Sequence, residues 1–161
     1  MNVKARIIAV LVAALACVAL LGGCAADAKS DAQTQNRQYM SSVNSIMSDM
    51  DDSMKEFSTA VKDGEVLSLS SELSTVNKCV DRLKAIQAPE ALKDVNSKYV
   101  NGAEELQTAL KLYVELYEDV KAPKSGSFDY SKYGDRLSKV KEHYDAGIKA
   151  LQEADEAVSK A

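Results

Sequence analysis

The longest regular pattern of apolar side chains lies at residues 92–120, which read LKDVNSKYVNGAEELQTALKLYVELYEDV. Its apolar positions follow one another in steps of three or four residues: Leu92, Val95, Tyr99, Ala103, Leu106, Leu110, Tyr113, Tyr117 and Val120. Such spacing places all of them on one face of an α-helix. A face of this length is stable when neighbouring helices cover it, so the stretch predicts a helical bundle.

The same spacing recurs in three other segments. The positions on their faces are Met40, Val43, Met47, Met50, Met54, Phe57 and Val61; Val66, Leu69, Leu73, Val76, Val80, Leu83 and Ile86; and Tyr133, Leu137, Val140, Tyr144, Ile148, Leu151, Asp155 and Val158. No segment alternates with a period of two residues, as a half-buried β-strand would. The sequence therefore predicts four helices whose faces form one core.

Breaks in the pattern predict where the helices end. Asp63-Gly64 ends the first segment, and Pro89 restricts the residue before it while suiting the first turn of the next helix. Residues 122–127, APKSGS, separate the last two segments, and Asp129 or Ser131 is a candidate helix cap. These signals predict helices over about 37–62, 66–87, 89–121 and 129–160.

Four helical segments joined by short connections favour an all-α, antiparallel up-down four-helix bundle. The alternative is two long helical hairpins that pack loosely or dimerise. At about 1.5 Å per residue, the third helix would be about 50 Å long and the second about 33 Å. We therefore expect the third helix to extend beyond the second.

The first residues have the composition of a targeting signal. Lys4 and Arg6 precede an apolar stretch from Ile7 to Leu21. About 15 residues match the apolar region of a secretory signal peptide and fall short of the roughly 18 to 20 that span a bilayer. The stretch predicts a leader at residues 1–23; an uncleaved membrane anchor is the alternative.

The leader ends in Leu21-Gly22-Gly23-Cys24, which resembles the lipobox of bacterial lipoproteins. The resemblance covers the leader and these four residues. It implies that the Cys24 thiol receives a diacylglyceryl group, that the leader is removed just before Cys24, and that the new amino terminus can also be acylated. Two or more acyl chains hold a protein stably on a membrane, because each buried CH₂ contributes roughly 0.8 kcal/mol.

Residues 25–36, AADAKSDAQTQN, are small and polar without apolar periodicity. Together with Cys24 they predict a lipidated, flexible tether at 24–36, followed by the bundle at 37–161. With Cys24 at a membrane, an up-down bundle would point two connections away from it, one at residues 63–66 and one at residues 122–130.

Aromatic residues are concentrated near the second of these connections. Of the nine aromatic residues in the chain, five lie within residues 112–133: Tyr113, Tyr117, Phe128, Tyr130 and Tyr133. Tyrosine combines a large contact area with a polar tip and a small entropy loss. These five residues are therefore the candidate partner or ligand surface, with packing in the core as the alternative.

Few residues are suited to catalysis or metal binding. The chain has one histidine, His143, interpreted as a residue at the rim of the core, and Cys79 is the one thiol left after the leader is removed and Cys24 is acylated. Phosphate-binding glycine loops, the Gly-x-Ser-x-Gly motif and His-Glu-x-x-His are missing from the sequence. We therefore expect no catalytic residues, no metal site and no cofactor.

Charge weighs against nucleic acid as a partner. The formal net charge is −4, and residues 24–161 carry 18 basic and 24 acidic side chains, or −6. The acidic residues Asp49, Asp51, Asp52 and Glu56 lack the spacing of an EF-hand and are interpreted as a solvated helix face.

Together these features predict a non-enzymatic, lipid-anchored cell-envelope protein whose bundle binds an envelope or extracellular protein. The alternative is a binding protein for a small apolar or amphiphilic ligand, held between helices by Met40, Met47, Met50 and Met54 and by tyrosines. For the methionines themselves, a place in the core is the simpler interpretation.

Overall fold

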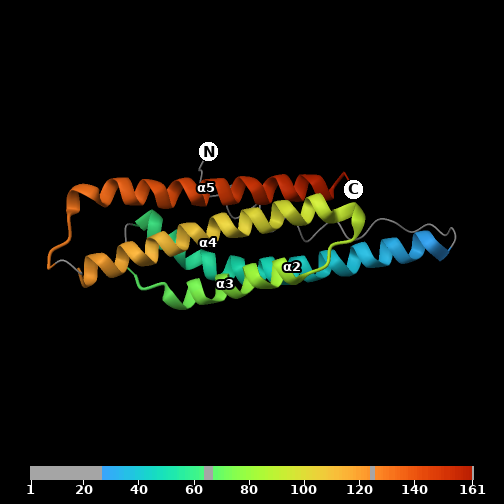
Figure 1. The fold of residues 1–161 in the computed structure, drawn as a ribbon, viewed down its shortest axis with the longest axis horizontal. Coiled ribbons are helices and arrows are strands. Elements are labelled where there is room, and N and C mark those ends of the chain that lie inside the picture. The colour runs from blue at the N-terminus through green and yellow to red at the C-terminus, as the bar shows by residue number, and fades with distance from the viewer. Residues whose placement is uncertain (1–26, 64–66, 124–125, 161) are drawn as a thin grey trace.

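The computed structural model describes residues 27–63, 67–123 and 126–160, which form an all-α, up-down four-helix bundle. The helices are α2 (Asp27–Asp63), α3 (Ser70–Ala85), α4 (Lys93–Lys121) and α5 (Tyr133–Val158) (Figure 1). Short 3₁₀ turns, η2 (Glu90–Leu92) and η3 (Tyr130–Lys132), precede α4 and α5. The predicted leader and Cys24 lie outside the described residues.

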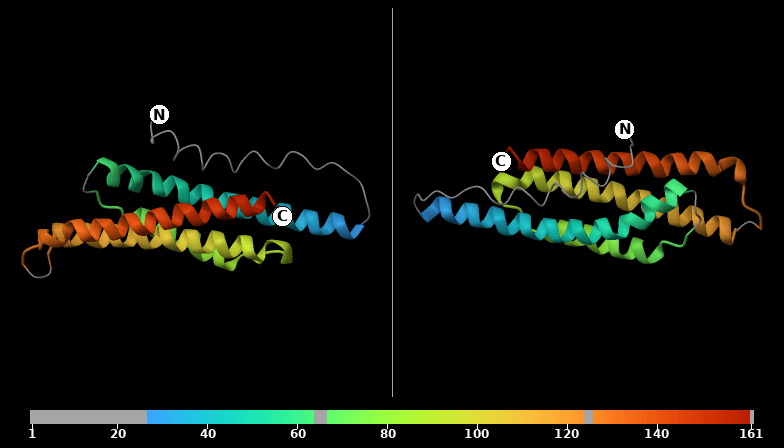
Figure 2. Two further views of the ribbon diagram at one scale, coloured as in Figure 1. Left: turned by 90° about the horizontal axis from the view of Figure 1, so that it is seen from above. Right: turned by 180° about the vertical axis from the view of Figure 1, so that it is seen from behind.

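The helices alternate in direction, so each end of the bundle carries a defined set of connections (Figures 1 and 2). We call the end with the α2–α3 and α4–α5 connections the distal end. The α3–α4 connection, the start of α2 and the end of α5 lie at the opposite, proximal end. The predicted fold class and the alternation of helices are confirmed.

α2 begins about ten residues earlier than predicted, which corrects the interpretation of residues 27–36 as a flexible tether. The segment contains no glycine or proline, and alanine, glutamine and lysine favour helix. Because a formed helix extends at little cost once it is nucleated, the packed part of α2 can continue into this polar stretch.

The other boundaries differ from prediction by a few residues. α3 begins at Ser70 and ends at Ala85, shorter at both ends than the predicted 66–87. α4 begins at Lys93 and α5 at Tyr133, because 3₁₀ turns take the residues directly before them. Asp129 caps the second turn by accepting a hydrogen bond from the Ser131 amide at 3.0 Å, as one of the two expected caps.

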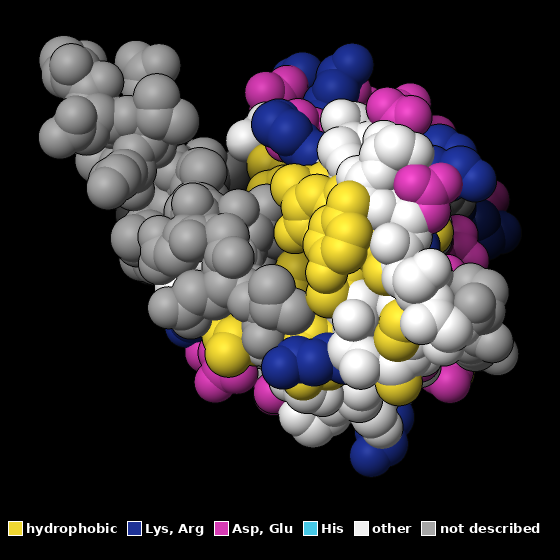
Figure 3. Space-filling model, turned by 90° about the vertical axis from the view of Figure 1, so that its left-hand side faces the viewer, with side chains coloured by type: hydrophobic (Ala, Val, Ile, Leu, Met, Phe, Trp, Pro, Cys, Tyr) yellow, Lys and Arg dark blue, Asp and Glu magenta, His cyan; other side chains and the backbone are white. Residues whose placement is uncertain are grey.

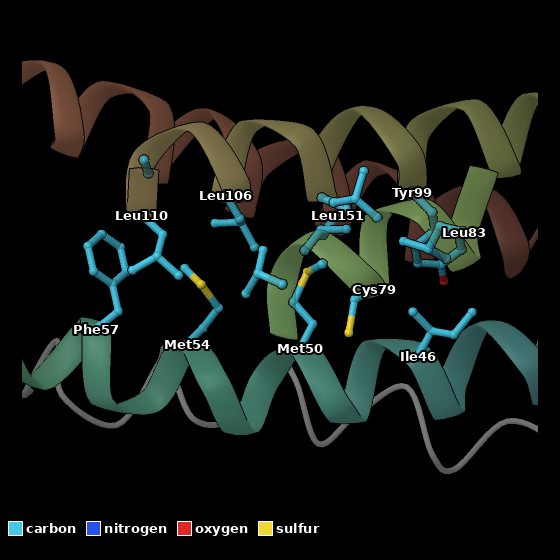
Figure 4. Packing of buried hydrophobic residues seen from close by; sticks show 14 of the residues in the cluster. Ile46, Met50, Met54, Phe57, Cys79, Leu83, Tyr99, Leu106, Leu110 and Leu151 are labelled. Carbon is cyan, nitrogen blue, oxygen red and sulfur yellow. The ribbon is translucent and has the colours of Figure 1, made fainter. Parts of the chain in front are cut away.

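The core contains most of the predicted apolar positions. Fully buried side chains include Met50, Phe57, Leu83 and Leu110, and Figure 4 shows α2 residues facing those of α4. On α2 the face is rotated slightly, because Tyr39 and Ile46 are buried while Met40 and Met47 are partly exposed. The rotation lets the buried phenol of Tyr39 donate a hydrogen bond to Asn96 Oδ1 on α4 at 3.0 Å.

Two glycines allow α4 and α5 to approach more closely than any side chain would permit. A Cβ atom built on Gly102 of α4 would lie 2.8 Å from Leu151 Cγ on α5, and one on Gly147 of α5 would lie 2.8 Å from Leu106 Cγ on α4. Both distances are shorter than a real carbon–carbon contact. The two glycines therefore fix the spacing of this helix pair.

Tyrosine hydroxyls tie the helices together at both ends of the bundle. Near the proximal end, Tyr99 on α4 donates to Asp155 Oδ1 on α5 at 2.6 Å. Near the distal end, the Leu67 amide donates to the Tyr113 hydroxyl at 3.3 Å, which joins the α2–α3 connection to α4. Each ring also packs in the core, so these tyrosines combine apolar burial with a satisfied polar tip.

No helix in the described part of the chain is both long enough and apolar enough to cross a bilayer. The described helices are amphipathic, and their apolar faces are directed into the bundle.

The close contact predicts that alanine destabilises the protein at Gly102 and Gly147, although glycine-to-alanine changes in helices usually stabilise. Although alanine favours helix over glycine by about 1 kcal/mol, we expect Gly102→Ala and Gly147→Ala each to lower the free energy of unfolding by about 1–3 kcal/mol, because helices must separate. Gly134→Ala is the matched control, since no atom outside its chain neighbours and the backbone of its own helix lies within 4 Å of its Cβ position. It should raise stability by about 0.5–1 kcal/mol. Urea unfolding followed by circular dichroism tests both; stabilisation by all three variants would contradict the close contact.

Candidate functional site

The α4–α5 hairpin extends beyond the other two helices at the distal end. Tyr113 bonds to Leu67 of the α2–α3 connection, so α4 residues after Tyr113 lie beyond that connection. Eight residues remain, about 12 Å of helix. The ribbon views show the same projection, which we call the overhang (Figures 1 and 2). The expected extension of the third helix beyond the second is confirmed.

The inner face of the overhang continues the core beyond the helices that cover it. On α4, Tyr117 and Val120 follow Tyr113 at four and seven residues and share its face. On α5, Leu137 and Tyr133 precede the buried Val140 by three and seven residues and share its face. These four side chains, Tyr117, Val120, Tyr133 and Leu137, are half-buried and are called the overhang face.

Three aromatic rings close the tip of the overhang. Phe128 makes edge-to-face contacts with Tyr130 and Tyr133, with ring centroids 4.9 and 6.4 Å apart. Asp129 holds the turn between them, because its carboxylate accepts bonds from the Ser131 amide and hydroxyl. These bonds hold the pKa of Asp129 below its ordinary value. The turn is thereby fixed while the ring of Tyr130 remains 70% exposed.

Charged side chains at the distal end pair with one another. Arg136 Nη1 on α5 lies 2.8 Å from Asp119 Oδ2 on α4, and Lys132 Nζ lies 3.6 Å from Asp129 Oδ2. The Lys121 ammonium lies 5.9 Å from the centre of the Tyr117 ring, within the range of a cation–π contact. Viewed end-on, the molecule presents hydrophobic side chains in the middle of the face, with charged side chains near the rim (Figure 3).

Of the five residues predicted to form the partner or ligand surface, Tyr113 lies apart from the other four. Tyr113 is 7% exposed and lies edge-on to Phe57 with ring centroids 5.5 Å apart, so it belongs to the core and not to a surface. Sequence reasoning placed it in the cluster because it shares a face with Tyr117. α2 covers Tyr113 through Phe57, and the α2–α3 connection reaches its hydroxyl through Leu67.

Sequence reasoning missed Leu67, which is 41% exposed. It lies in the connection that Tyr113 holds, at the base of the overhang. Leu67 falls between the periodic positions Val66 and Leu69. The sequence did contain a signal for its exposure, because Leu67 is an apolar residue that lies in a connection and outside the periodic pattern.

Several titratable side chains of the described residues are paired or buried. His143 Nδ1 on α5 lies 2.7 Å from Glu105 Oε2 on α4, with both side chains partly exposed, which agrees with its interpretation as a rim residue. Cys79 is buried, and burial raises the pKa of its thiol, which favours the unreactive protonated form. Within the described residues, no group of three or more His, Cys, Asp or Glu side chains could hold a metal ion.

The acidic residues of α2 are partly paired. Asp49 Oδ2 lies 2.6 Å from Arg82 Nη1 on α3, and Lys55 Nζ lies within 3.3 Å of carboxylate oxygens on Asp51 and Asp52. All of these side chains except Asp51 are about half exposed or more, so the contacts contribute little stability. They are the contacts of a solvated face.

Met50 and Met54 lie in the core, whereas Met40 and Met47 are partly buried against it. Met50 and Met54 are 1% and 6% exposed, and their thioethers face α4 (Figure 4). A groove of about 490 Å³ lies elsewhere, between α2 and α3, and is lined by Ser41, Ser42, Ser45, Ile46, Arg82, Ala85 and Ile86. It is shallow and mostly polar at its α2 wall. An apolar ligand between the helices would have to displace packed side chains.

Comparison with known proteins adds no relative. No family model, no curated protein and no solved structure matches the chain.

Tyr99 and Asp155 provide a pH test of the packing. Burial raises the pKa of the Asp155 carboxyl, and the Tyr99 hydrogen bond opposes this shift without cancelling it. A carboxyl with a raised pKa in the folded state favours folding when protonated, so its contribution is lost as pH rises through that pKa. The same burial, with the bond to Asp155, raises the pKa of the Tyr99 phenol.

We expect Asp155→Asn to be more stable than the natural chain at pH 7, because asparagine retains an acceptor for Tyr99 and carries no buried charge. The advantage should shrink as pH falls toward about 4, the ordinary pKa of aspartate. Urea midpoints at several pH values measure this. Glu156→Gln, an exposed neighbour, controls for the general loss of charge. A less stable Asp155→Asn at pH 7 would mean that the charged hydrogen bond outweighs desolvation.

Proposed function

We propose that the chain is a lipid-anchored, non-enzymatic protein of the bacterial cell envelope whose distal end binds a partner protein. The single observation that carries the binding role is the position of its exposed apolar groups. Two large hydrophobic side chains are exposed in the described part of the chain, Leu67 and Tyr130, and both lie at the distal end. An apolar surface gathered at one end is typical of an interaction site.

The anchor is supported by the leader and by the Leu21-Gly22-Gly23-Cys24 motif. α2 begins three residues after Cys24, at the proximal end. Its 37 residues correspond to about 55 Å of helix. A lipid on Cys24 would therefore leave the distal end pointing away from the membrane, where a partner can reach it.

Rigid aromatic groups suit such a surface. Phe128 and Tyr130 are held by ring contacts and by the Asp129 turn, so little side-chain freedom remains to be lost on binding. Tyr117 and Tyr133 on the overhang face are half-buried and could be covered fully by a partner. Burial of tyrosine in the centre of an interface is a common source of binding energy.

A ligand-binding protein remains the second candidate, but the core residues proposed for it are packed against one another. Native mass spectrometry of protein extracted in mild detergent separates the two functions. A co-purifying small molecule would favour the ligand-binding function, and a stoichiometric protein would favour the interaction function.

The anchor predicts that Cys24→Ser abolishes the acyl mass of the protein and weakens its attachment to the membrane. Without a thiol at position 24, no diacylglyceryl group can be attached, and the unmodified leader is then the sole apolar segment. Flotation of membranes with intact mass analysis measures both location and acyl mass. The buried Cys79→Ala is the control and should retain the acyl mass. Acyl mass on Cys24→Ser protein would remove the proposed anchor.

The interaction surface predicts that Phe128→Ser with Tyr130→Ser reduces partner capture about tenfold or more, because the aromatic contacts of the tip are lost. Photo-crosslinking from position 67 in intact cells measures the capture. Helical circular dichroism should be unchanged, since Tyr130 is exposed and Phe128 is half-buried. Lys93→Ser with Glu156→Ser, near the proximal end, is the matched control. Equal capture by the tip variant and the natural chain would contradict this placement.

A further inference from the structure

In the described part of the chain, α2 and α3 do not extend to the end of the overhang face. Below it, α4 and α5 are covered by α2 and α3. Beyond Tyr113 the same faces continue through Tyr117, Val120, Tyr133 and Leu137, and the ribbon views show α4 and α5 projecting past the ends of α2 and α3 (Figures 1 and 2). The missing cover is a pair of antiparallel helix ends about two turns long, with an apolar inner side.

We propose that this cover is supplied by the overhang of a second copy of the chain, bound head to head. The overhang is itself a pair of antiparallel helix ends of this length, and its inner side is the overhang face. Two overhangs that approach from opposite directions can each occupy the space beyond the other's α2 and α3. The four helix ends then form a short four-helix bundle that continues both cores.

Charge favours the same partner. Between residues 117 and 137 the sequence has four basic side chains, Lys121, Lys124, Lys132 and Arg136, and four acidic ones, Glu118, Asp119, Asp129 and Asp135. The net charge of this stretch is zero, whereas that of the whole chain is −4. The tip can therefore approach its own copy without strong net repulsion.

The head-to-head arrangement forms a closed dimer of two copies. A two-fold axis perpendicular to the bundle relates the overhangs, so each surface is used once and no chain of subunits grows. In this arrangement the tip of one copy, with Tyr130, reaches the base of the other overhang, where Leu67 is exposed. The two exposed large hydrophobic side chains of the described residues would cover each other.

The direction of the two copies has a consequence for membranes. Head-to-head binding places the proximal ends, and thus both Cys24 anchors, at opposite ends of the pair. This inference rests on the proposed lipid anchor. Two copies would then join two membrane surfaces, and copies anchored side by side in one membrane would not be paired by this surface.

The test uses the full, natively acylated chain in phosphatidylcholine vesicles. Two vesicle populations carry lipid dyes of different colour, and fluorescence cross-correlation measures their association. We expect association when both populations carry the chain and at least about tenfold less with Tyr130→Glu, which places carboxylates in the contact. Since Tyr130 is 70% exposed, this variant should keep its helical content and melting temperature. Glu156→Lys, near the proximal end, is the control.

Cross-linking tests the register of the pair. One population carries Tyr130→Cys and the other Leu67→Cys, and mild oxidation should join them into a disulfide dimer. Glu156→Cys in place of either should give no dimer. Association without the 130–67 cross-link would overturn the head-to-head arrangement.

Flotation separates failure of this inference from failure of the proposed function. Chains that float with the vesicles but do not associate them would overturn pairing by a second copy and leave the anchor and a different protein partner in place. Chains that do not float would overturn the anchor and the inference together.

Discussion

The close contact between Gly102 and Gly147 is the constraint on which the other features of this bundle depend. With no Cβ atoms between them, α4 and α5 lie near enough for Leu106 and Leu151 to pack against the opposite helix backbone. The resulting hairpin forms one side of the bundle, and α2 and α3 pack along it. Because the hairpin does not depend on cover along its whole length, it can project past the other helices and carry exposed aromatic residues at its end.

The tyrosines connect this hairpin to the rest of the bundle and mark where the cover ends. Tyr39 joins α2 to α4 through Asn96, and Tyr113 joins the α2–α3 connection to α4. Burial raises the pKa of the Tyr39 phenol to about 12, so this donor stays protonated over the physiological range. Tyr117, one turn beyond Tyr113, is half-buried and lies on the overhang face. The same residue type therefore serves packing at one position and a surface at the next.

Much of the fold could be predicted from the sequence, because four runs of apolar residues with helical spacing allow few other architectures. The register of Met50, Phe57, Val80 and Leu110 in the core followed from that spacing. Boundaries were less accurate at polar ends. Residues 27–36 carry no apolar period that requires helix, so their helical state depends on continuation from the packed part of α2.

The candidate site could be predicted as a region but not as a surface. The density of tyrosine and phenylalanine near residues 113–133 located it, and the unequal helix lengths indicated that part of it would project. Which rings are covered depends on how far α2 and its connection reach, a property of three-dimensional packing that spacing along the chain does not encode. For this reason Tyr113, predicted at the surface, lies in the core, and Leu67, for which no role was predicted, is exposed.

The early start of α2 has a mechanical consequence. On the anchoring proposed for Cys24, two residues separate the acylated position from a helix that runs on without interruption into the core. Because this connection is short and helical, the bundle would tilt as one rigid body about its anchor and would not move freely on a flexible tether. A small change of tilt at the anchor would then move the distal surface a long way sideways while its distance from the anchor stays nearly constant. The distal surface would therefore search for a partner within a thin layer at a fixed distance from the anchor.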